Sequence, residues 1–276
     1  MCRTPEGSIK TTKLLSENPE SYKDAALHGI RTLMGIADAH GPIPGDKIFA
    51  VKMGTTVATN ALLERKGDRT ALVINAGFGD ALRIAYQARP DIFAREIVLP
   101  QQLYERVVEV HGRHNVRGEV LRPLDVDDAR RKLEEVYASG IRSVAIVLMH
   151  SYRYAEFEKR IADVARGIGF TQVSTSHETT PLMKLVSRGD TTAVDAYLSP
   201  ILRRYVGQVA EEIQGTRLLF MQSNGGLKSS SLFQGKDAIL SGPAGGIVSA
   251  AQTCRLAGFD EVVGFDMGGT STDVCK

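Results

Sequence analysis

The segment from Ser143 to Met149, aliphatic from Val144 onward, limits the folds open to this chain more than any other segment. It shows no alternation of polar and apolar residues, so it predicts a strand that is buried on both faces of a sheet. Helical patterns flank it on both sides, over residues 125–140 and 155–166. This order of helix, strand and helix predicts an α/β architecture with a parallel or mixed sheet.

Composition places the chain among globular proteins. Of its 276 residues, 43% are hydrophobic and 24% are charged, which leaves enough apolar material for a sizeable core. The formal net charge is +2 and no long run of one sign occurs, so neither nucleic acid nor a membrane surface is an expected partner. The cysteines Cys2, Cys254 and Cys275 lack metal-ligand spacing, and the first residues lack the apolar core of a signal peptide. These features predict free thiols in a cytoplasmic protein.

The other periodic segments predict a continuing series of helices and strands. Asn18 followed by Pro19 is typical of a helix start, and Gly67 is typical of a helix end. Asp190 is expected to cap a helix that Pro200 interrupts. The expected series is a helix after residue 18, a strand at 48–52, a helix at 58–66, a strand at 70–74, a helix at 190–213, a strand at 218–221, a helix at 247–256 and a last strand that ends near residue 266.

The last residues, VVGFDMGGTSTDVCK, carry the most specific motif, in which an apolar strand leads into Asp266 and the pair Gly268-Gly269. Paired glycines let the backbone approach a ligand closely, and main-chain N–H groups can then donate to phosphate oxygens, as can the hydroxyls of Thr270, Ser271 and Thr272. Asp266 is placed to hold Mg²⁺ through water, because Mg²⁺ binds one or two carboxylates together with phosphate. A Gly-Gly hairpin turn is the structural alternative, but the flanking hydroxyls and the two aspartates favour a phosphate site.

Three further glycine-containing loops have both a functional and a structural interpretation. SGPAGG (241–246) precedes a helix, where anions bind, but it lacks the lysine of a Walker A loop and is equally typical of a close-packing turn. QSNGG (222–226) ends a strand, and the same two interpretations apply to it. MGTTVATN (53–60) lies at a strand-to-helix junction, where helix capping by Thr55 or Thr56 is slightly favoured.

Taken together, these loops resemble the hydantoinase A/5-oxoprolinase family. The similar segments follow that family's order from about residue 50 to the last residue: MGTTVATNALLERKG, QARPDIF, SRGDTTAVDAYLSPILRRY, MQSNGG, LSGPAGG and FDMGGTSTDV. The resemblance implies an α/β, mixed-sheet lobe of an actin/sugar-kinase/Hsp70-type ATPase, in which two related phosphate loops close on ATP and Mg²⁺. The pattern of elements restarts near residue 175, so we expect a hydantoinase/oxoprolinase N-terminal region at 1–175 and the start of the hydantoinase A ATPase region at 176–276.

The resemblance also implies an activity, the ATP-dependent opening of a cyclic amide such as 5-oxoproline or a hydantoin. The amide oxygen is phosphorylated and the activated ring is then hydrolysed. Asp266 and Asp273 are the expected catalytic carboxylates, with Asp266 on the metal. The facing wall of the cleft is expected from Gly54, Thr55, Thr56, Asn224, Gly225, Ser241, Gly242, Gly245 and Gly246. Expected partners are the cyclic amide, a hydantoinase B-like subunit or domain, and further copies in an oligomer.

Two alternatives stay open, although QARPDIF and VVEV are closer to the oxoprolinase branch of the family. One is an acetone carboxylase-like subunit that phosphorylates a ketone and bicarbonate. The other is a non-catalytic remnant that binds a partner subunit. Family members begin with a first phosphate loop, Asp-x-Gly-Gly-Thr-Phe-Thr-Asp, which is not found before Arg3, and they continue well beyond the second loop. We therefore expect a truncated chain that is inactive by itself.

Overall fold

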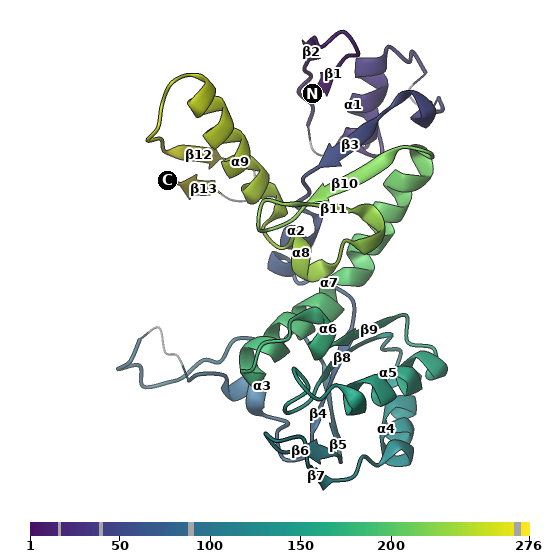
Figure 1. Ribbon diagram of the computed structural model, residues 1–276, viewed down its shortest axis with the longest axis vertical. Coiled ribbons are helices and arrows are strands. Elements are labelled where there is room, and N and C mark those ends of the chain that lie inside the picture. The colour runs from purple at the N-terminus through teal and green to yellow at the C-terminus, as the bar shows by residue number, and fades with distance from the viewer. Residues whose placement is uncertain (16–17, 39–40, 88–90, 268–271) are drawn as a thin grey trace.

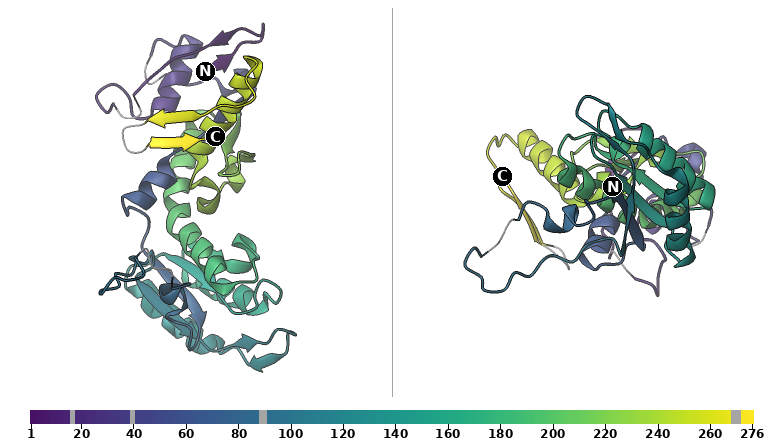
Figure 2. Two further views of the ribbon diagram at one scale, coloured as in Figure 1. Left: turned by 90° about the vertical axis from the view of Figure 1, so that its left-hand side faces the viewer. Right: turned by 90° about the horizontal axis from the view of Figure 1, so that it is seen from below.

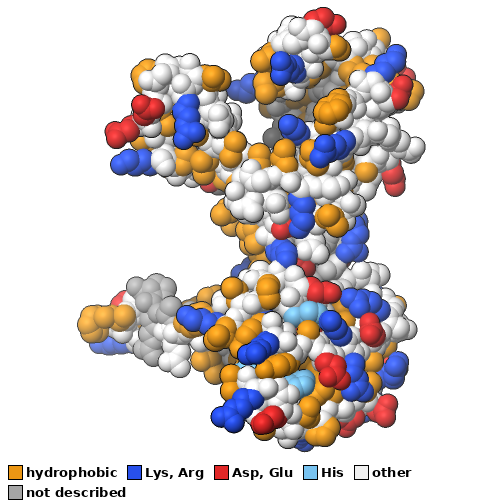
Figure 3. All heavy atoms as spheres, viewed as in Figure 1, with side chains coloured by type: hydrophobic (Ala, Val, Ile, Leu, Met, Phe, Trp, Pro, Cys, Tyr) orange, Lys and Arg blue, Asp and Glu red, His pale blue; other side chains and the backbone are white. Residues whose placement is uncertain are grey.

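Helix α7 (Leu185–Glu212) runs between two parts of the molecule, each built on its own sheet (Figure 1). The computed structural model describes residues 1–15, 18–38, 41–87, 91–267 and 272–276. A third piece, the C-terminal arm, projects from the upper part and is seen from two further directions in Figure 2. Charged side chains of both signs are scattered over the visible face in Figure 3, as the near-zero net charge predicts.

The lower part is built on a four-stranded parallel sheet with the strand order β5-β4-β8-β9. The strands are β4 (Thr70–Asn75), β5 (Arg106–Val110), β8 (Ser143–Val147) and β9 (Gln172–Thr175). Helices α4 (Val126–Ala138) and α5 (Glu156–Ile168) cover one face, while α3 (Ala81–Ile84) and the first half of α7 cover the other. Val144 and Ile146 pack on one side and Ala145 and Val147 on the other, which confirms a strand buried on both faces.

The upper part has a mixed sheet with the strand order β11-β10-β3. Strand β3 (Ala50–Met53) is parallel to β10 (Arg217–Met221), and β11 (Leu227–Ser229) is antiparallel to β10. Strands β3 and β10 share one apolar core with α1 (Ala25–Met34), α2 (Val57–Leu63), α8 (Gly235–Ala238) and the second half of α7. Because β3 and β10 are parallel, the loops that follow them leave the sheet at the same edge.

The C-terminal arm consists of α9 (Ser241–Leu256) and the antiparallel strands β12 (Gly264–Met267) and β13 (Thr272–Cys275). Small elements complete the described chain: β1 (Cys2–Arg3) with β2 (Ile9–Lys10), β6 (Arg113–His114) with β7 (Val120–Arg122), α6 (Ser176–Thr179), and 3-10 helices at 45–47 and 230–232. Among the described residues, no helix combines the length and apolar character needed to cross a membrane.

The first helix starts later than its sequence predicts. The carboxylate of Asp24, the N-cap of α1, accepts a hydrogen bond of 2.8 Å from the Leu27 N–H. The main-chain oxygen of Asn18 accepts the N–H of Tyr22 in a preceding turn, so the predicted cap at Asn18 is wrong. The cap predicted for α4 is confirmed, because the Asp125 carboxylate accepts the N–H of Asp128 at 3.0 Å.

The predicted helix end at Gly67 is also wrong. Helix α2 stops at Leu63, and the left-handed residue that follows it is Arg65, with φ of 57°. Gly67 is required for a different reason. A Cβ atom there would lie 2.2 Å from an atom of the Tyr197 ring, so only glycine fits between the end of α2 and α7.

Helix α7 continues through Pro200, although an interruption is predicted there. Proline has no N–H and displaces the preceding turn, so nearby helix carbonyls lose their usual donors. Two donors from outside the helix replace them. The Ser143 hydroxyl donates to the oxygen of Ala196 at 2.6 Å, and the Asp68 N–H donates to the oxygen of Tyr197 at 3.0 Å. Asp190 lies inside this helix, which begins at Leu185, so the predicted cap at Asp190 is wrong.

Candidate phosphate-binding site

The loops after β3 and β10 meet the start of α9 at one edge of the upper sheet. We call residues 54–56, 222–226 and 241–246 the glycine wall. The hydroxyl oxygen of Ser241 is its central atom: it donates to the main-chain oxygen of Met221 at 2.7 Å and accepts the N–H of Thr55 at 3.3 Å. Ser241 is fully buried. One side chain thus joins the carboxyl ends of both parallel strands to the beginning of the helix.

SGPAGG forms the first turns of α9, and the helix begins at Ser241 instead of the predicted Ile247. Pro243 fits there because the first turn of a helix needs no partner for its N–H groups. The N-cap residue, Leu240, supplies no side-chain hydrogen bond to this helix end. An uncapped N-terminus carries partial positive charge and free N–H donors, which suits a phosphate oxygen.

The two threonines of the first loop differ in their roles. The side-chain oxygen of Thr55 accepts the N–H of Val57 at 3.2 Å, so Thr55 caps the start of α2 as its structural interpretation predicts. Thr56 is the N-cap by position, yet it makes no side-chain capping bond. A Cβ atom at Gly242 would lie 2.8 Å from the Thr56 methyl carbon. Glycine at position 242 therefore permits the close approach of α9 to this loop.

QSNGG forms the tight turn between β10 and β11. The N–H of Gln222 donates to the oxygen of Gly226 at 2.8 Å, and the Asn224 side-chain oxygen accepts the N–H of Gly226 at 2.9 Å. Gly225 has φ of 80°, a left-handed conformation that favours glycine. A Cβ atom at Gly225 would lie 3.2 Å from a methyl group of Val248, which places this turn against α9.

Asp266 lies on β12, opposite α9. A Cβ atom at Gly246 would be 3.9 Å from its carboxylate oxygen, so the helix backbone and the carboxylate are close neighbours. Asp266 is paired directly with Asp273 of β13. Like charges at opposed positions of an antiparallel pair repel each other unless a cation lies near them. Thr272 adjoins this pair.

The tip of the terminal motif, Gly268, Gly269, Thr270 and Ser271, lies outside the described residues. Among the residues that the structure describes, no group of three or more His, Cys, Asp or Glu side chains could hold a metal ion. The described part of the motif therefore contributes two opposed carboxylates, Asp266 and Asp273.

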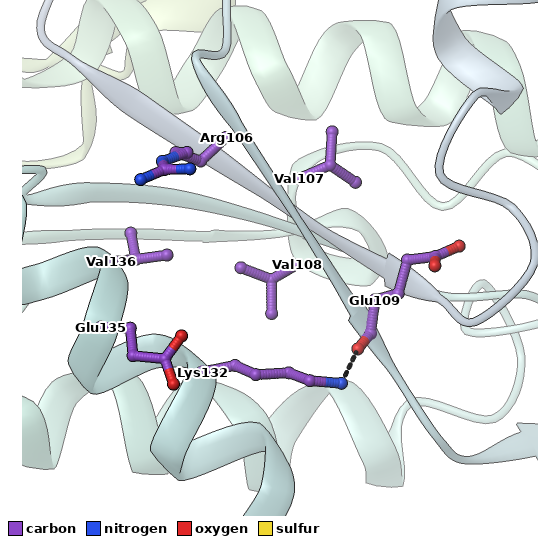
Figure 4. A pocket seen from close by; sticks show the side chains of 7 residues that line it. All are labelled: Arg106, Val107, Val108, Glu109, Lys132, Glu135 and Val136. Carbon is purple, nitrogen blue, oxygen red and sulfur yellow. Dashed lines mark hydrogen bonds between the residues drawn. The ribbon is translucent and has the colours of Figure 1, made fainter.

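Sequence reasoning missed three surface hollows of about 350, 660 and 380 Å³, which lie along β5 in the lower part. Figure 4 shows the first of them, where Lys132 of α4 donates to the main-chain oxygen of Glu109 at 2.8 Å. Their lining contains none of the residues of the glycine wall and neither Asp266 nor Asp273. No motif marks this surface, and we assign the candidate site to the glycine wall because its donors match the chemistry of phosphate.

Comparison with known proteins agrees with the motifs. Residues 1–169 match the hydantoinase/oxoprolinase N-terminal region, and residues 188–276 match the hydantoinase/oxoprolinase family. The chain is 43% identical over 295 residues to 5-oxoprolinase 1 of Arabidopsis thaliana and 38% identical over 305 residues to 5-oxoprolinase of Saccharomyces cerevisiae. Each alignment covers 96% of this chain and 23% of the relative, so the chain spans about a quarter of their length.

Two solved structures have a similar fold. The ATP-dependent caprolactamase from Pseudomonas jessenii matches with a TM-score of 0.72 and 31% identity, over 88% of this chain and 37% of that chain. The nucleotide-free structure of acetone carboxylase matches with a TM-score of 0.72 and 24% identity, over 91% and 38%. The mixed α/β fold is therefore shared with both, and the resemblance that the motifs indicated is confirmed: the chain belongs to the hydantoinase/oxoprolinase family.

Proposed function

We propose that this chain is part of an ATP-dependent enzyme that opens a cyclic amide, either 5-oxoproline, with glutamate as the product, or a hydantoin. The hypothesis rests on family membership together with the glycine wall. Relatives that align with almost the whole chain are named 5-oxoprolinase, and a structural relative is an ATP-dependent caprolactamase. Because the chain spans 23% of the length of those oxoprolinases, the remaining part of the active site would come from further sequence.

One observation carries the proposal: an uncapped helix N-terminus lies beside two hydroxyl-bearing strand ends, and the Asp266 carboxylate lies near Gly246 of the same helix. The N–H groups at the start of α9 would donate to phosphate oxygens, together with Thr56. Ser241 holds the geometry because its hydroxyl is already occupied by Met221 and Thr55. The residues of the glycine wall therefore fit the phosphate part of a nucleotide.

Asp266 would hold Mg²⁺ through water, and Asp273, its partner on β13, is the second proposed carboxylate of the site. Bound ATP would supply the phosphoryl group that converts the amide oxygen into a leaving group, since an amide carbonyl is a poor electrophile. The residues of this chain contribute by positioning and by electrostatic stabilisation. The terminal glycines and hydroxyls, from Gly268 to Thr272, complete the proposed set of phosphate donors.

The same hypothesis assigns the architecture and partners. The upper part with the C-terminal arm would be the beginning of an actin/sugar-kinase/Hsp70-type lobe, with residues 1–175 as the N-terminal region and 176–276 as the start of the ATPase region. A hydantoinase B-like subunit or domain would complete the hydrolytic step, and the enzyme would assemble as an oligomer.

The test is ADP release by the full-length gene product with three candidate substrates. 5-Oxoproline, a hydantoin, and acetone with bicarbonate are each compared with a no-substrate blank. We expect a cyclic amide to stimulate ADP release and to be opened in equal amount. Stimulation by acetone and bicarbonate alone would identify an acetone carboxylase-like enzyme instead. Absence of stimulation by all three in a protein that binds ATP would contradict the proposal.

A further inference from the structure

A chain of hydrogen bonds runs from the lower sheet to the glycine wall, and the buried carboxylate of Asp195 lies at its centre. Asp195 is on α7 and only 2% of its surface is exposed. One carboxylate oxygen accepts the hydroxyl of Ser174, on β9, at 2.7 Å. The other accepts the hydroxyl of Ser199 at 3.0 Å and the N–H of Lys236, on α8, at 3.1 Å. Strand β9, helix α7 and helix α8 are thus joined at the side chain of Asp195.

The connection continues from α8 to the start of α9. The main-chain oxygen of Asp237 accepts both the N–H and the hydroxyl of Ser223, at 2.8 and 2.9 Å. The Ser223 hydroxyl in turn accepts the N–H of Leu240 at 3.2 Å. Leu240 is the N-cap of α9, directly before Ser241. The bonds at Asp195 therefore fix the segment that leads into the candidate site.

Further contacts hold α8 against α7 and the end of α6. The N–H of Gly235 donates to the Ser199 hydroxyl at 2.9 Å, and a Cβ atom at Gly235 would lie 2.8 Å from the Ser199 nitrogen. The ammonium group of Lys236 donates to the main-chain oxygens of Glu178 and Thr179, at the end of α6. Lys236 is thus bound to the lower part through its side chain and to Asp195 through its backbone.

A buried carboxylate is costly unless its oxygens are fully hydrogen-bonded, and bonds to a charged acceptor are stronger and more directional than neutral ones. Apolar residues could pack α7 against α8 without that cost. The arrangement at Asp195 instead fixes the relative position of β9, α7 and α8, as fully satisfied buried polar networks do.

We propose that Asp195 is a positioning residue that sets the glycine wall relative to the lower sheet by joining Ser174 to the backbone of α8. An effect of Asp195 on nucleotide binding rests on the proposed function. The coupling of the lower sheet to the glycine wall through Asp195 does not depend on that function. Asp195 touches no proposed ligand position; it acts through Lys236, Ser223 and the start of α9.

Hydrogen exchange measured by mass spectrometry on the 276-residue chain tests this coupling. In Asp195→Ala we expect amide exchange over residues 235–244 to rise by about tenfold or more, because charged hydrogen bonds are lost. Exchange in β4 and β8 should stay unchanged. Asp195→Asn should restore much of the protection, since its amide oxygen can still accept the Lys236 N–H. Ser174→Ala should raise exchange over the same residues by a smaller factor.

The matched control is Thr192→Val, a buried position on the same helix. Its hydroxyl donates only to the helix oxygen of Arg188, at 2.7 Å, and not to α8. We expect this variant to leave exchange over 235–244 unchanged. The proposal is overturned if Asp195→Ala leaves that segment as protected as in the unmodified chain, if Thr192→Val exposes it equally, or if exchange rises uniformly through the whole chain.

In the full-length enzyme, Asp195→Ala is expected to raise the KM for ATP severalfold while kcat changes less, and Asp195→Asn should recover most of the affinity. An unchanged KM together with the predicted exchange pattern would support the coupling and count against the nucleotide site at the glycine wall. The two proposals can therefore fail separately.

Discussion

The hydroxyl of Ser241 donates a hydrogen bond of 2.7 Å to the main-chain oxygen of Met221, and so fastens the start of α9 to the carboxyl end of β10. The same oxygen accepts the N–H of Thr55, which follows β3. A single buried atom therefore holds together three of the segments that the sequence motifs single out.

Replacing Ser241 by alanine leaves the Thr55 N–H without its acceptor and the Met221 oxygen without its donor. We expect the free energy of unfolding of the 276-residue chain to fall by about 1–3 kcal/mol. Urea denaturation measures this change. Ser231→Ala is the control, because Ser231 is exposed and its hydroxyl is hydrogen-bonded to the equally exposed hydroxyl of Ser229, at 3.3 Å. Equal midpoints for the two variants would contradict the role assigned to Ser241.

Gly67→Ala and Gly167→Ala should have opposite effects on stability. At Gly67 a Cβ atom would lie 2.2 Å from the ring of the buried Tyr197, and this overpacking should cost about 1–3 kcal/mol. At Gly167, inside α5, nothing lies within 4 Å of the added atom, so the better helix former should stabilise by about 0.5–1 kcal/mol. The unfolding temperatures of both variants, compared with that of the unmodified chain, test this prediction. A stable Gly67→Ala protein would show that α2 and α7 can separate.

Stability should fall steeply in alkali because of one tyrosine. Burial, with a contribution from Asp24, raises the pKa of Tyr205 to about 12. An unfolded tyrosine titrates near 10. Above that pH the unfolded chain loses the proton first, so this contribution is complete below about pH 10 and is lost as pH rises toward 12.

Tyr205→Phe removes this dependence. Discounted for partial exposure, the unmodified chain should lose about 1–2 kcal/mol more than the variant between pH 9 and 11.5. Urea midpoints for both chains at the two pH values provide the comparison, since all other tyrosines and lysines are common to both. If the two chains lose stability in parallel, Tyr205 is hydrated in the folded state.

The 276-residue chain alone should bind Mg-ATP in the millimolar range or more weakly. The chain spans about a quarter of the length of its oxoprolinase relatives, and our proposal leaves the rest of the phosphate-binding surface to further sequence. The loss of those contacts should exceed the roughly 4 kcal/mol that separates micromolar from millimolar affinity. Isothermal titration gives the affinity directly. Micromolar binding would mean that this chain already contains a complete nucleotide site.

The sequence predicts the two central strands of the lower sheet, β4 and β8, because their signals are local, whereas the edge strands β5 and β9 are not predicted. Val144 to Val147 lies between two helices and is apolar throughout, which favours a strand buried on both faces. Asp125 similarly predicts the start of α4, since a cap acts on the next residues of the chain.

The errors arise where a distant residue decides the local structure. Helix α7 passes Pro200 because donors from Ser143 and Asp68 replace the lost hydrogen bonds, and neither is near in sequence. SGPAGG forms the start of α9, where Gly242 allows close contact with Thr56, whereas glycine and proline alone are typical of a turn.

In the candidate site, too, the sequence indicates the local motifs but not the contacts between distant residues. The motifs at 54–56, 222–226 and 241–246 could each be recognised, but each has a structural role that the sequence left as an alternative. The contacts made by Ser241 depend on the parallel pairing of β3 with β10, which no single motif contains. Asp195 belongs to a segment that resembles the family, yet its bonds to Ser174 and Lys236 could be found only in the folded chain.

Substrate-dependent ADP release by the Asp266→Ala variant of the full-length protein tests the central claim most directly. Asp260→Ala is the control, because Asp260 is an exposed carboxylate before β12. We predict that Asp266→Ala lowers cyclic-amide-dependent ADP release by about a hundredfold or more, as the loss of an electrostatic stabiliser does, with unchanged unfolding temperature, while Asp260→Ala keeps normal turnover. Near-normal turnover in Asp266→Ala would contradict the assignment of this edge of the fold to the nucleotide phosphates and their metal.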